Sequence, residues 1–359
     1  MKLSTLILAA AVAITASLLA APLAGAATKD KALATCQDSE GQTSPIDRIA
    51  ACTKVIDEGR LKGNDLSIIY RIRGTQYMIV AEQTGDKSNI TLAIADFDKG
   101  IELSPTSATP YLTRCVAHFR LEDFERALAD CTKASELNPK LAAAWGGRAM
   151  AHQALGNLEV AVKDAGEAIR LEPKAPRWYR ARAGALRMLE RHAEAVKDLD
   201  KAIALSPPDA EKALMLRQRG LSHGELGDFK KAIADLDEAN RLKPNDRTIL
   251  NDRCWVRGQW GQELDKALAD CDASLAIEKA STTYDSRGFV NLRRGDPSSA
   301  FVDFDAAVKL DADRGSPLYG RGIARLRLGQ TQEGQADIVA AITKDPKIAS
   351  RYAKYGLSP

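Results

Sequence analysis

The chain is predicted to be an all-α solenoid built from helix–turn–helix repeats. Six cysteines fall into three pairs whose members are 16, 16 and 17 residues apart. Small residues that follow an arginine recur at intervals of 41, 34, 34, 37, 34, 34 and 34 residues, at Gly74, Cys115, Ala149, Ala183, Gly220, Cys254, Gly288 and Gly322. A repeated interval of this length indicates a repeated supersecondary unit.

Each unit is expected to contain two helices that pack closely. A second small residue lies on a later segment of every unit, and a third follows seven positions further on, as Ala161 and Ala168 do. Small residues at i and i+7 lie on one face of a helix and let a neighbouring helix approach. Most units then end at a proline, which cannot continue a helix. These prolines are Pro105, Pro139, Pro173, Pro207, Pro244 and Pro346.

This 34-residue pattern resembles the tetratricopeptide repeat over almost all of the mature chain. The unit after Leu141 matches it at Trp145, Ala149, Ala161, Ala168 and Pro173. The resemblance implies a right-handed superhelical solenoid of about nine repeats with a C-terminal capping helix. The expected boundaries are 29–62 (a degenerate first repeat), 67–107 (with an insertion between its helices), 108–141, 142–175, 176–209, 213–246, 247–280, 281–314, 315–346 and 347–359 (the capping helix).

The capping helix is predicted from its apolar spacing. Ile348, Tyr352 and Tyr355 lie at i, i+4 and i+7, and Gly356 is placed to end the helix. A repeat cannot bury its own apolar face, so an array needs a lid at each end. At the first repeat, a disulfide between Cys36 and Cys52 can serve instead.

Residues 1–26 are predicted to be a secretory signal peptide. An apolar stretch follows Lys2 and ends at the small-residue site Ala24-Gly25-Ala26. The alternative is an uncleaved anchor. After cleavage the protein is expected to be periplasmic or secreted, with no membrane span. A net charge of +3 is too mild for a nucleic-acid-binding surface.

Three disulfides are predicted, Cys36–Cys52, Cys115–Cys131 and Cys254–Cys271, because they account for every cysteine and the signal indicates an oxidising compartment. The alternative is buried free thiols, since cysteine is a good small core residue. No two cysteines have the close spacing of a zinc knuckle, so no metal or cofactor is expected. The four histidines are interpreted as packing or turn residues.

A ladder of structural salt bridges is predicted between the two helices of each repeat. Its pairs are Arg73–Asp96, Arg114–Asp130, Arg148–Asp164, Arg182–Asp198, Arg219–Asp235, Arg253–Asp270, Arg287–Asp303 and Arg321–Asp337. Residues about sixteen apart lie at similar height in a helical hairpin, so each arginine can reach its aspartate. Arg182→Ala and Asp198→Ala are each expected to destabilise the fold, and the double variant much less than their sum.

Two surfaces are candidates for partner binding. The first helices are expected to line a concave face, on which Met150, Leu221, Trp255 and Phe289 form part of an apolar column, with Trp255 and Phe289 as its best anchor. The alternative is that this column packs between adjacent first helices. Arg177, Arg180, Arg187 and Arg217 form a cationic cluster that either grips an acidic peptide or lies solvated beside glutamates.

No catalytic motif is present: the chain lacks a G-x-S-x-G elbow, a phosphate loop and a His-Glu-x-x-His pair. We therefore expect a non-catalytic scaffold in the cell envelope that binds a protein or peptide partner of unknown identity. The alternatives are an accessory factor of envelope polysaccharide or outer-layer assembly, and a structural array that associates with itself. The sequence leaves the oligomeric state open.

Overall fold

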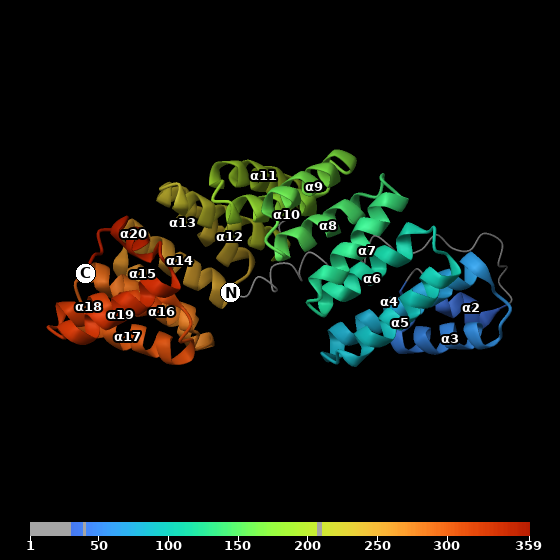
Figure 1. The fold of residues 1–359 in the computed structure, drawn as a ribbon, viewed down its shortest axis with the longest axis horizontal. Helices are drawn as coiled ribbons and strands as arrows, with labels where there is room; N and C mark the ends of the chain where they lie inside the picture. Colours follow the sequence, from blue (N-terminus) through green and yellow to red (C-terminus); the bar gives the residue numbers. More distant parts are fainter. Residues whose placement is uncertain (1–29, 39–40, 207–209) are drawn as a thin grey trace. The chain divides into compact units, whose positions relative to one another are not determined.

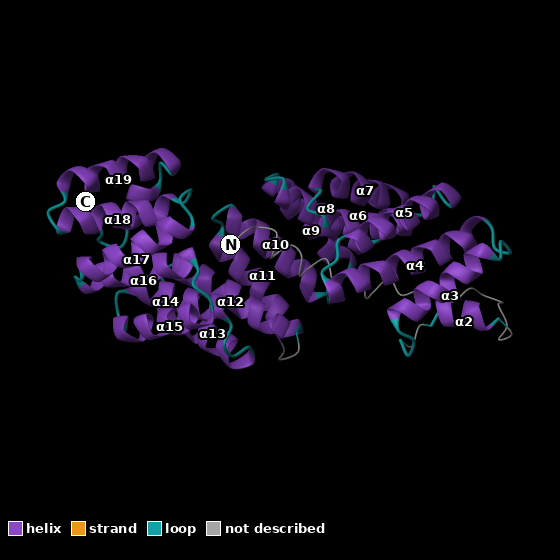
Figure 2. Ribbon diagram, turned by 90° about the horizontal axis from the view of Figure 1, so that it is seen from below, coloured by secondary structure: helices purple, strands orange, loops and turns teal. Residues whose placement is uncertain are grey.

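The computed structural model describes residues 30–38, 41–206 and 210–359. Within these residues the chain is helical, and no strand occurs (Figure 2). The predicted signal peptide lies outside the described residues. No helix among those described combines the length and the apolar character needed to cross a bilayer. The chain divides into two compact units, unit 1 (Met1–Glu190) and unit 2 (Arg191–Pro359).

The helices of each unit follow one another in chain order as hairpins (Figure 1). The described helices of unit 1 are α2 (Lys31–Cys36), α3 (Pro45–Asp57), α4 (Gly63–Thr84), α5 (Ser88–Leu103), α6 (Ala108–Arg120), α7 (Phe124–Leu137), α8 (Ala142–Ala154), α9 (Leu158–Leu171) and α10 (Pro176–Met188). Those of unit 2 are α11 (His192–Leu205), α12 (Ala210–Glu225), α13 (Phe229–Leu242), α14 (Arg247–Trp260), α15 (Leu264–Ile277), α16 (Ser281–Arg294), α17 (Pro297–Leu310), α18 (Gly315–Arg327), α19 (Thr331–Lys344) and α20 (Ile348–Ala353). The prediction of an all-α array of helix pairs is confirmed.

The small residues of the pattern lie where two helices touch. A β-carbon added at Gly74 would stand 2.6 Å from the Phe97 ring, and one at Gly220 would stand 2.9 Å from the Ala232 carbonyl oxygen. Neither distance is compatible with a larger side chain. The first and second helices of these repeats can therefore approach closely only because the position is small.

The second repeat departs from expectation in how it takes up its extra residues. The sequence suggests an insertion between the helices, in the stretch 81–91. Most of these residues instead lengthen the ends of the helices: α4 runs for 22 residues. It ends at Thr84 and is capped by Gly85, whose φ of 75° is left-handed. Extending a helix satisfies each new backbone group internally, which a longer loop would not do.

The turns between the two helices of a repeat use a left-handed residue. Gly156 and Gly227 supply it at φ of 80° and 84°, as their turn sequences suggest. Glu122 and Glu190 occupy the same place in other repeats at φ of 60° and 59°. The hairpin geometry therefore imposes this conformation even where glycine is absent.

Candidate functional site

The arginine–aspartate pairs form a ladder inside the repeats. Arg114 Nε and Nη2 donate to the two oxygens of Asp130 at 2.8 and 2.7 Å, and Arg148 donates in the same way to Asp164 at 2.7 and 2.7 Å. Bidentate bonds also join Arg73–Asp96, Arg219–Asp235, Arg253–Asp270, Arg287–Asp303 and Arg321–Asp337. The remaining pair, Arg182–Asp198, stays a prediction, because Arg182 lies in unit 1 and Asp198 lies in unit 2.

The aspartates of the ladder are buried. Burial raises the pKa of the Asp96 and Asp303 carboxyls, against the opposing pull of Arg73 and Arg287. The hydrogen bonds that Arg114 donates to Asp130 raise the pKa of Arg114. The arginine charge is thus neutralised within the fold, and the ladder is structural in its geometry.

A second row of carboxylates links five arginines of the ladder to the repeat before them. In unit 2, Arg287 Nη1 donates to Asp272 at 2.6 Å, and the same contact joins Arg219–Asp200, Arg253–Asp237 and Arg321–Asp305. In unit 1, Arg114 donates to Asp98 at 2.6 Å. The sequence reasoning missed these links. Their signal in the sequence is the Asp-x-Asp spacing, as in Asp270 and Asp272.

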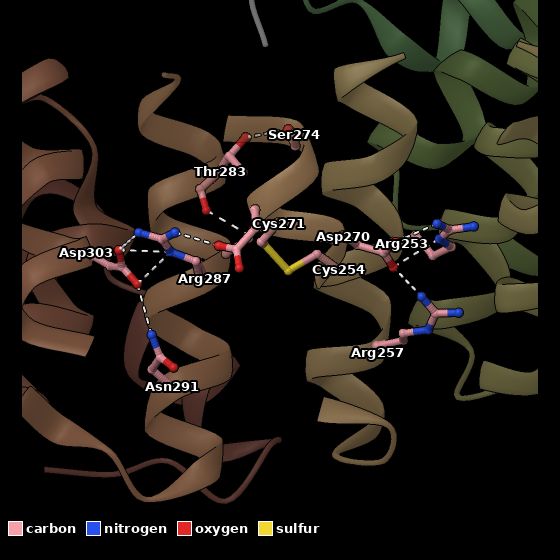
Figure 3. The surroundings of a disulfide bond; sticks show 12 residues. Arg253, Cys254, Arg257, Asp270, Cys271, Ser274, Thr283, Arg287, Asn291 and Asp303 are labelled. Carbon is pink, nitrogen blue, oxygen red and sulfur yellow. Dashed lines mark hydrogen bonds and ion pairs between the residues drawn. A yellow bond between two sulfur atoms is a disulfide. The ribbon is translucent and has the colours of Figure 1, made fainter. Parts of the chain in front are cut away.

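The cysteines lie beside this ladder and are bonded in the three expected pairs: Cys36–Cys52, Cys115–Cys131 and Cys254–Cys271. Figure 3 shows the third pair joining α14 to α15 next to Asp270, which accepts from both Arg253 and Arg257. Ser274 and Thr283 meet on the other side of it at 3.1 Å. Both sulfurs of the third pair are inaccessible to solvent. Three bonded pairs are compatible with an oxidising compartment.

Two of the four named side chains of the apolar column are buried, and one of them is Phe289, which was expected to be part of the exposed anchor. Met150 in unit 1 is 3% exposed and Phe289 in unit 2 is 0% exposed, so neither presents a free side chain. Trp255 and Leu221 are half-buried. In unit 1 the cause is packing among first helices: Met150 belongs to a cluster with Val116 and Trp178. The packing alternative therefore holds for Met150 and Phe289.

In unit 2 the cover over this column is the end of the chain itself. The Phe289 ring lies 4.7 Å from Trp255, 5.6 Å from Tyr352 and 5.8 Å from Tyr355, between ring centroids. Tyr352 also meets Tyr319 at 5.0 Å. We call Trp255, Phe289 and Tyr319 the aromatic surface, and residues 348–357 the C-terminal segment. These three rings come from the first helices α14, α16 and α18.

Polar contacts hold the C-terminal segment at both of its tyrosines. The Tyr352 hydroxyl donates to the Ser316 carbonyl oxygen at 3.1 Å, and burial raises its pKa. The Tyr355 hydroxyl accepts from Gln259 Nε2 at 2.6 Å, and Arg293 donates to the Tyr355 carbonyl oxygen. Lys354 Nζ lies 3.3 Å from the Glu225 carbonyl oxygen. The segment therefore crosses several repeats on their first helices, whereas the sequence suggested a lid on the last repeat.

The four arginines of the predicted cationic cluster belong to two different units: three lie on α10 of unit 1, and Arg217 lies on α12 of unit 2. On α10, Arg177 forms an ion pair with Glu172 at 2.7 Å, and its guanidinium lies 4.6 Å from the Trp178 ring centroid. Arg180 is buried and Arg187 is half-buried on the same helix. Arg217 belongs to unit 2, where it forms an ion pair with Asp252.

The histidines of the repeats face the ladder. His118 Nε2 lies 3.7 Å from Asp130, and His152 Nε2 lies 4.0 Å from Asp164. Burial lowers the pKa of His118, His152 and His223 below the ordinary value. Across the described part of the chain, no group of three His, Cys, Asp or Glu side chains is arranged to hold a metal ion.

Comparison with known protein families identifies the repeat pattern directly. One tetratricopeptide repeat family model matches residues 147–210, and a second matches residues 215–246. No curated protein sequence matches the chain.

Solved structures with this fold are similar over most of the chain. A chain of the APC/C hetero-tetramer Cut9-Hcn1 has a TM-score of 0.58 at 14% identity, and the match covers 92% of this chain and 64% of that one. A tetratricopeptide repeat protein from Parabacteroides merdae has a TM-score of 0.53 at 15% identity, covering 75% and 98%. Pseudomonas aeruginosa pilF has a TM-score of 0.50 at 16% identity, covering 58% and 94%. At these identities the similarity concerns the fold alone.

Proposed function

The chain is a tetratricopeptide repeat protein, and on that premise we propose that it is a non-catalytic scaffold that binds a protein or peptide partner on the first-helix face of its repeats. Such repeats stack into extended surfaces that suit macromolecular partners. The charges of the ladder are neutralised internally. Binding therefore falls to the apolar and aromatic side chains of the first helices.

One observation carries this proposal: the aromatic surface of unit 2 already receives a helical segment. Aromatic rings supply large contact areas, and amphipathic helices bind in apolar grooves through anchors at i, i+4 and i+7. Ile348, Tyr352 and Tyr355 have this spacing and lie with Phe289 in one cluster. A surface that holds such a helix within the chain has the shape and chemistry to hold one from a partner.

We also propose that the protein works outside the cytosol, in the cell envelope. Three disulfides in one chain support this location, because cytosolic thiols are kept reduced. The signal-like residues 1–26 support it from the sequence alone. Fractionation of cells, followed by thiol labelling without reductant, tests the location. Recovery of six free thiols from a cytosolic fraction would contradict it.

Site-specific photo-crosslinking in the native compartment tests the binding proposal. A benzophenone side chain is introduced in place of Trp255, which is half-buried on the aromatic surface. The matched control replaces Val302, which is 65% exposed on the second helix α17. We expect one predominant protein adduct at position 255 and none of it at position 302. The same adducts at both positions, or only adducts of the chain with itself, would contradict a partner-binding face.

A further inference from the structure

We propose that the aromatic surface is a docking site for an amphipathic helix of a partner protein, one that carries two tyrosines at i and i+3 with a lysine before the second. In the free protein, the C-terminal segment occupies this site in cis, and the partner helix displaces it. This inference rests on the proposed scaffold function and names the chemistry of its partner.

The C-terminal segment has the properties of a detachable occupant. Its helix α20 is only six residues long. A helix of this length is not stable alone in water, so it forms because it is bound. Its outer face is solvent-exposed at Arg351, Ala353 and Lys354. The contacts that hold it thus come from the surface beneath, and the segment unfolds when that surface is taken by another helix.

The surface beneath the segment selects tyrosine over a purely apolar ring. Tyr352 is inserted between Phe289 and Tyr319, and its hydroxyl meets the Ser316 carbonyl oxygen at 3.1 Å. The hydroxyl of Tyr355 is met by Gln259 at 2.6 Å. Buried polar groups of a site that pairs with a hydroxyl are left unpaired when the hydroxyl is absent. A partner helix with phenylalanine at these places would therefore bind less tightly.

Charge at the rim orients the occupant. Lys354 lies 3.5 Å from the Glu225 carboxylate, and Gln259 bonds Glu225 at 3.3 Å while it bonds Tyr355. Arg293 donates to the backbone carbonyl of Tyr355, near the end of the bound helix. Cationic groups interact favourably with the carbonyl end of a helix. These contacts place the lysine beside Glu225 and fix which end of a partner helix lies over α14.

A segment tethered in cis competes strongly with a partner in trans. Only residues 345–347 separate α19 from α20. A short tether gives an effective concentration on the order of millimolar, so the cis occupant suppresses binding of an equivalent peptide by a large factor. Weakening the occupant, while the surface stays intact, should therefore increase binding of a peptide with the same chemistry.

Fluorescence anisotropy with a labelled peptide of residues 345–359 tests the proposal on the full chain. We expect Tyr355→Ala to bind the peptide at least about tenfold more tightly than the unsubstituted chain, because the cis occupant has lost an anchor. Tyr355→Phe should show a smaller increase. Tyr284→Ala is the matched control on α16 and should leave binding unchanged. The same peptide with both tyrosines replaced by alanine should not bind Tyr355→Ala.

The remaining outcomes separate this inference from the scaffold proposal. Equal binding by the unsubstituted chain and Tyr355→Ala would overturn displacement in cis and leave the scaffold standing. No binding by any variant would overturn the docking site, while crosslinking at position 255 decides the scaffold function independently. A dimer of the unsubstituted chain in light scattering, lost in Tyr355→Ala, would assign the site to a second copy and overturn a separate partner. If circular dichroism finds Tyr355→Ala unfolded, Leu357→Ala provides the same comparison.

Discussion

The two units cover the same column of first-helix residues in different ways. In unit 1, Met150 is covered by Val116, Trp178 and other residues of one continuous core that extends through α6, α8 and α10. In unit 2, Phe289 is covered by Tyr352 and Tyr355 of the C-terminal segment. The first arrangement is part of the repeat packing and cannot open without unfolding. The second is a separate segment, so the same column can become a binding surface only in unit 2.

The units also differ in how their repeats are tied together. In unit 2, arginines of the ladder reach back to an aspartate of the preceding repeat, as Arg287 does to Asp272. In unit 1, Arg114 does the same to Asp98, but Arg73 and Arg148 donate to the hydroxyls of Thr53 and Ser135. An ion pair adds the attraction of two opposite charges, which a bond from arginine to a neutral hydroxyl lacks. Among the described residues, unit 2, which holds the C-terminal segment, therefore has more ion pairs between its repeats than unit 1.

The largest effect expected is from removing one partner of the ladder. Asp164→Ala in unit 1 should reduce the free energy of unfolding by about 3 kcal/mol, because it leaves Arg148 without its buried carboxylate. Asp303→Ala in unit 2 should cost less, since Arg287 keeps Asp272. Urea denaturation followed by circular dichroism measures both. An equal or larger loss for Asp303→Ala would contradict the link between repeats, and additive losses with Arg148→Ala would contradict the pair itself.

Removing a disulfide should be comparably costly and alike in the two units. The pairs Cys115–Cys131 and Cys254–Cys271 close loops of similar length, with separations of 16 and 17 residues. Replacing either pair by alanine should destabilise the chain by about 3 kcal/mol, through the freedom regained by the unfolded state. Thermal unfolding of the two double variants checks this. Two variants as stable as the parent chain would indicate thiols rather than bonds in the native protein.

Filling the close helix contacts should have an intermediate effect. A β-carbon at Gly146 would stand 2.0 Å from the Trp178 ring in unit 1, and one at Gly320 would stand 2.2 Å from the Phe304 ring in unit 2. Each glycine-to-alanine change should therefore cost about 1–3 kcal/mol by overpacking. The control is Gly166→Ala, whose nearest neighbour is 3.7 Å away, and which should stabilise its helix by up to about 1 kcal/mol. Similar behaviour of all three variants would contradict the described packing.

The smallest expected effect is a dependence of stability on pH. Burial lowers the pKa of His118 and His152 in unit 1 and of His223 in unit 2. The unfolded chain then binds more protons than the folded chain below about pH 6.5, the ordinary value for histidine. Stability present above that pH is lost as the pH falls towards the lowered values. His118→Gln should flatten the melting temperature between pH 7.5 and 5.5, and an unchanged slope would contradict this origin.

The repeat architecture could be predicted from the sequence because its signals are local and periodic. Arginine, small residue and aspartate recur at fixed spacing, and each has its partner within the same hairpin, as Arg148 and Asp164 do. The sequence shows how many extra residues the second repeat contains, but not whether they extend a helix or a loop. The lengthening of α4 was therefore not predicted. The Asp272 link was missed because one carboxylate had already been assigned to Arg287.

The position of the C-terminal segment could not be predicted in the same way. The spacing of Ile348, Tyr352 and Tyr355 indicates a helix with one apolar face, and that part of the prediction agrees with α20. The spacing does not say which surface that face covers. The bond between Gln259 and Tyr355 joins residues 96 apart, well outside the repeat period. Phe289 packs against Tyr352 and Tyr355 of the same segment.

Hydrogen exchange measured by mass spectrometry on the full chain tests most directly whether the C-terminal segment is a detachable cover. We predict that amides of residues 348–357 exchange more slowly than an unstructured chain but faster than those of α16, through opening of the segment alone. Addition of the 345–359 peptide at high concentration should accelerate their exchange. Protection of the segment equal to that of α16, unaffected by the peptide, would show a permanent part of the fold and contradict the account.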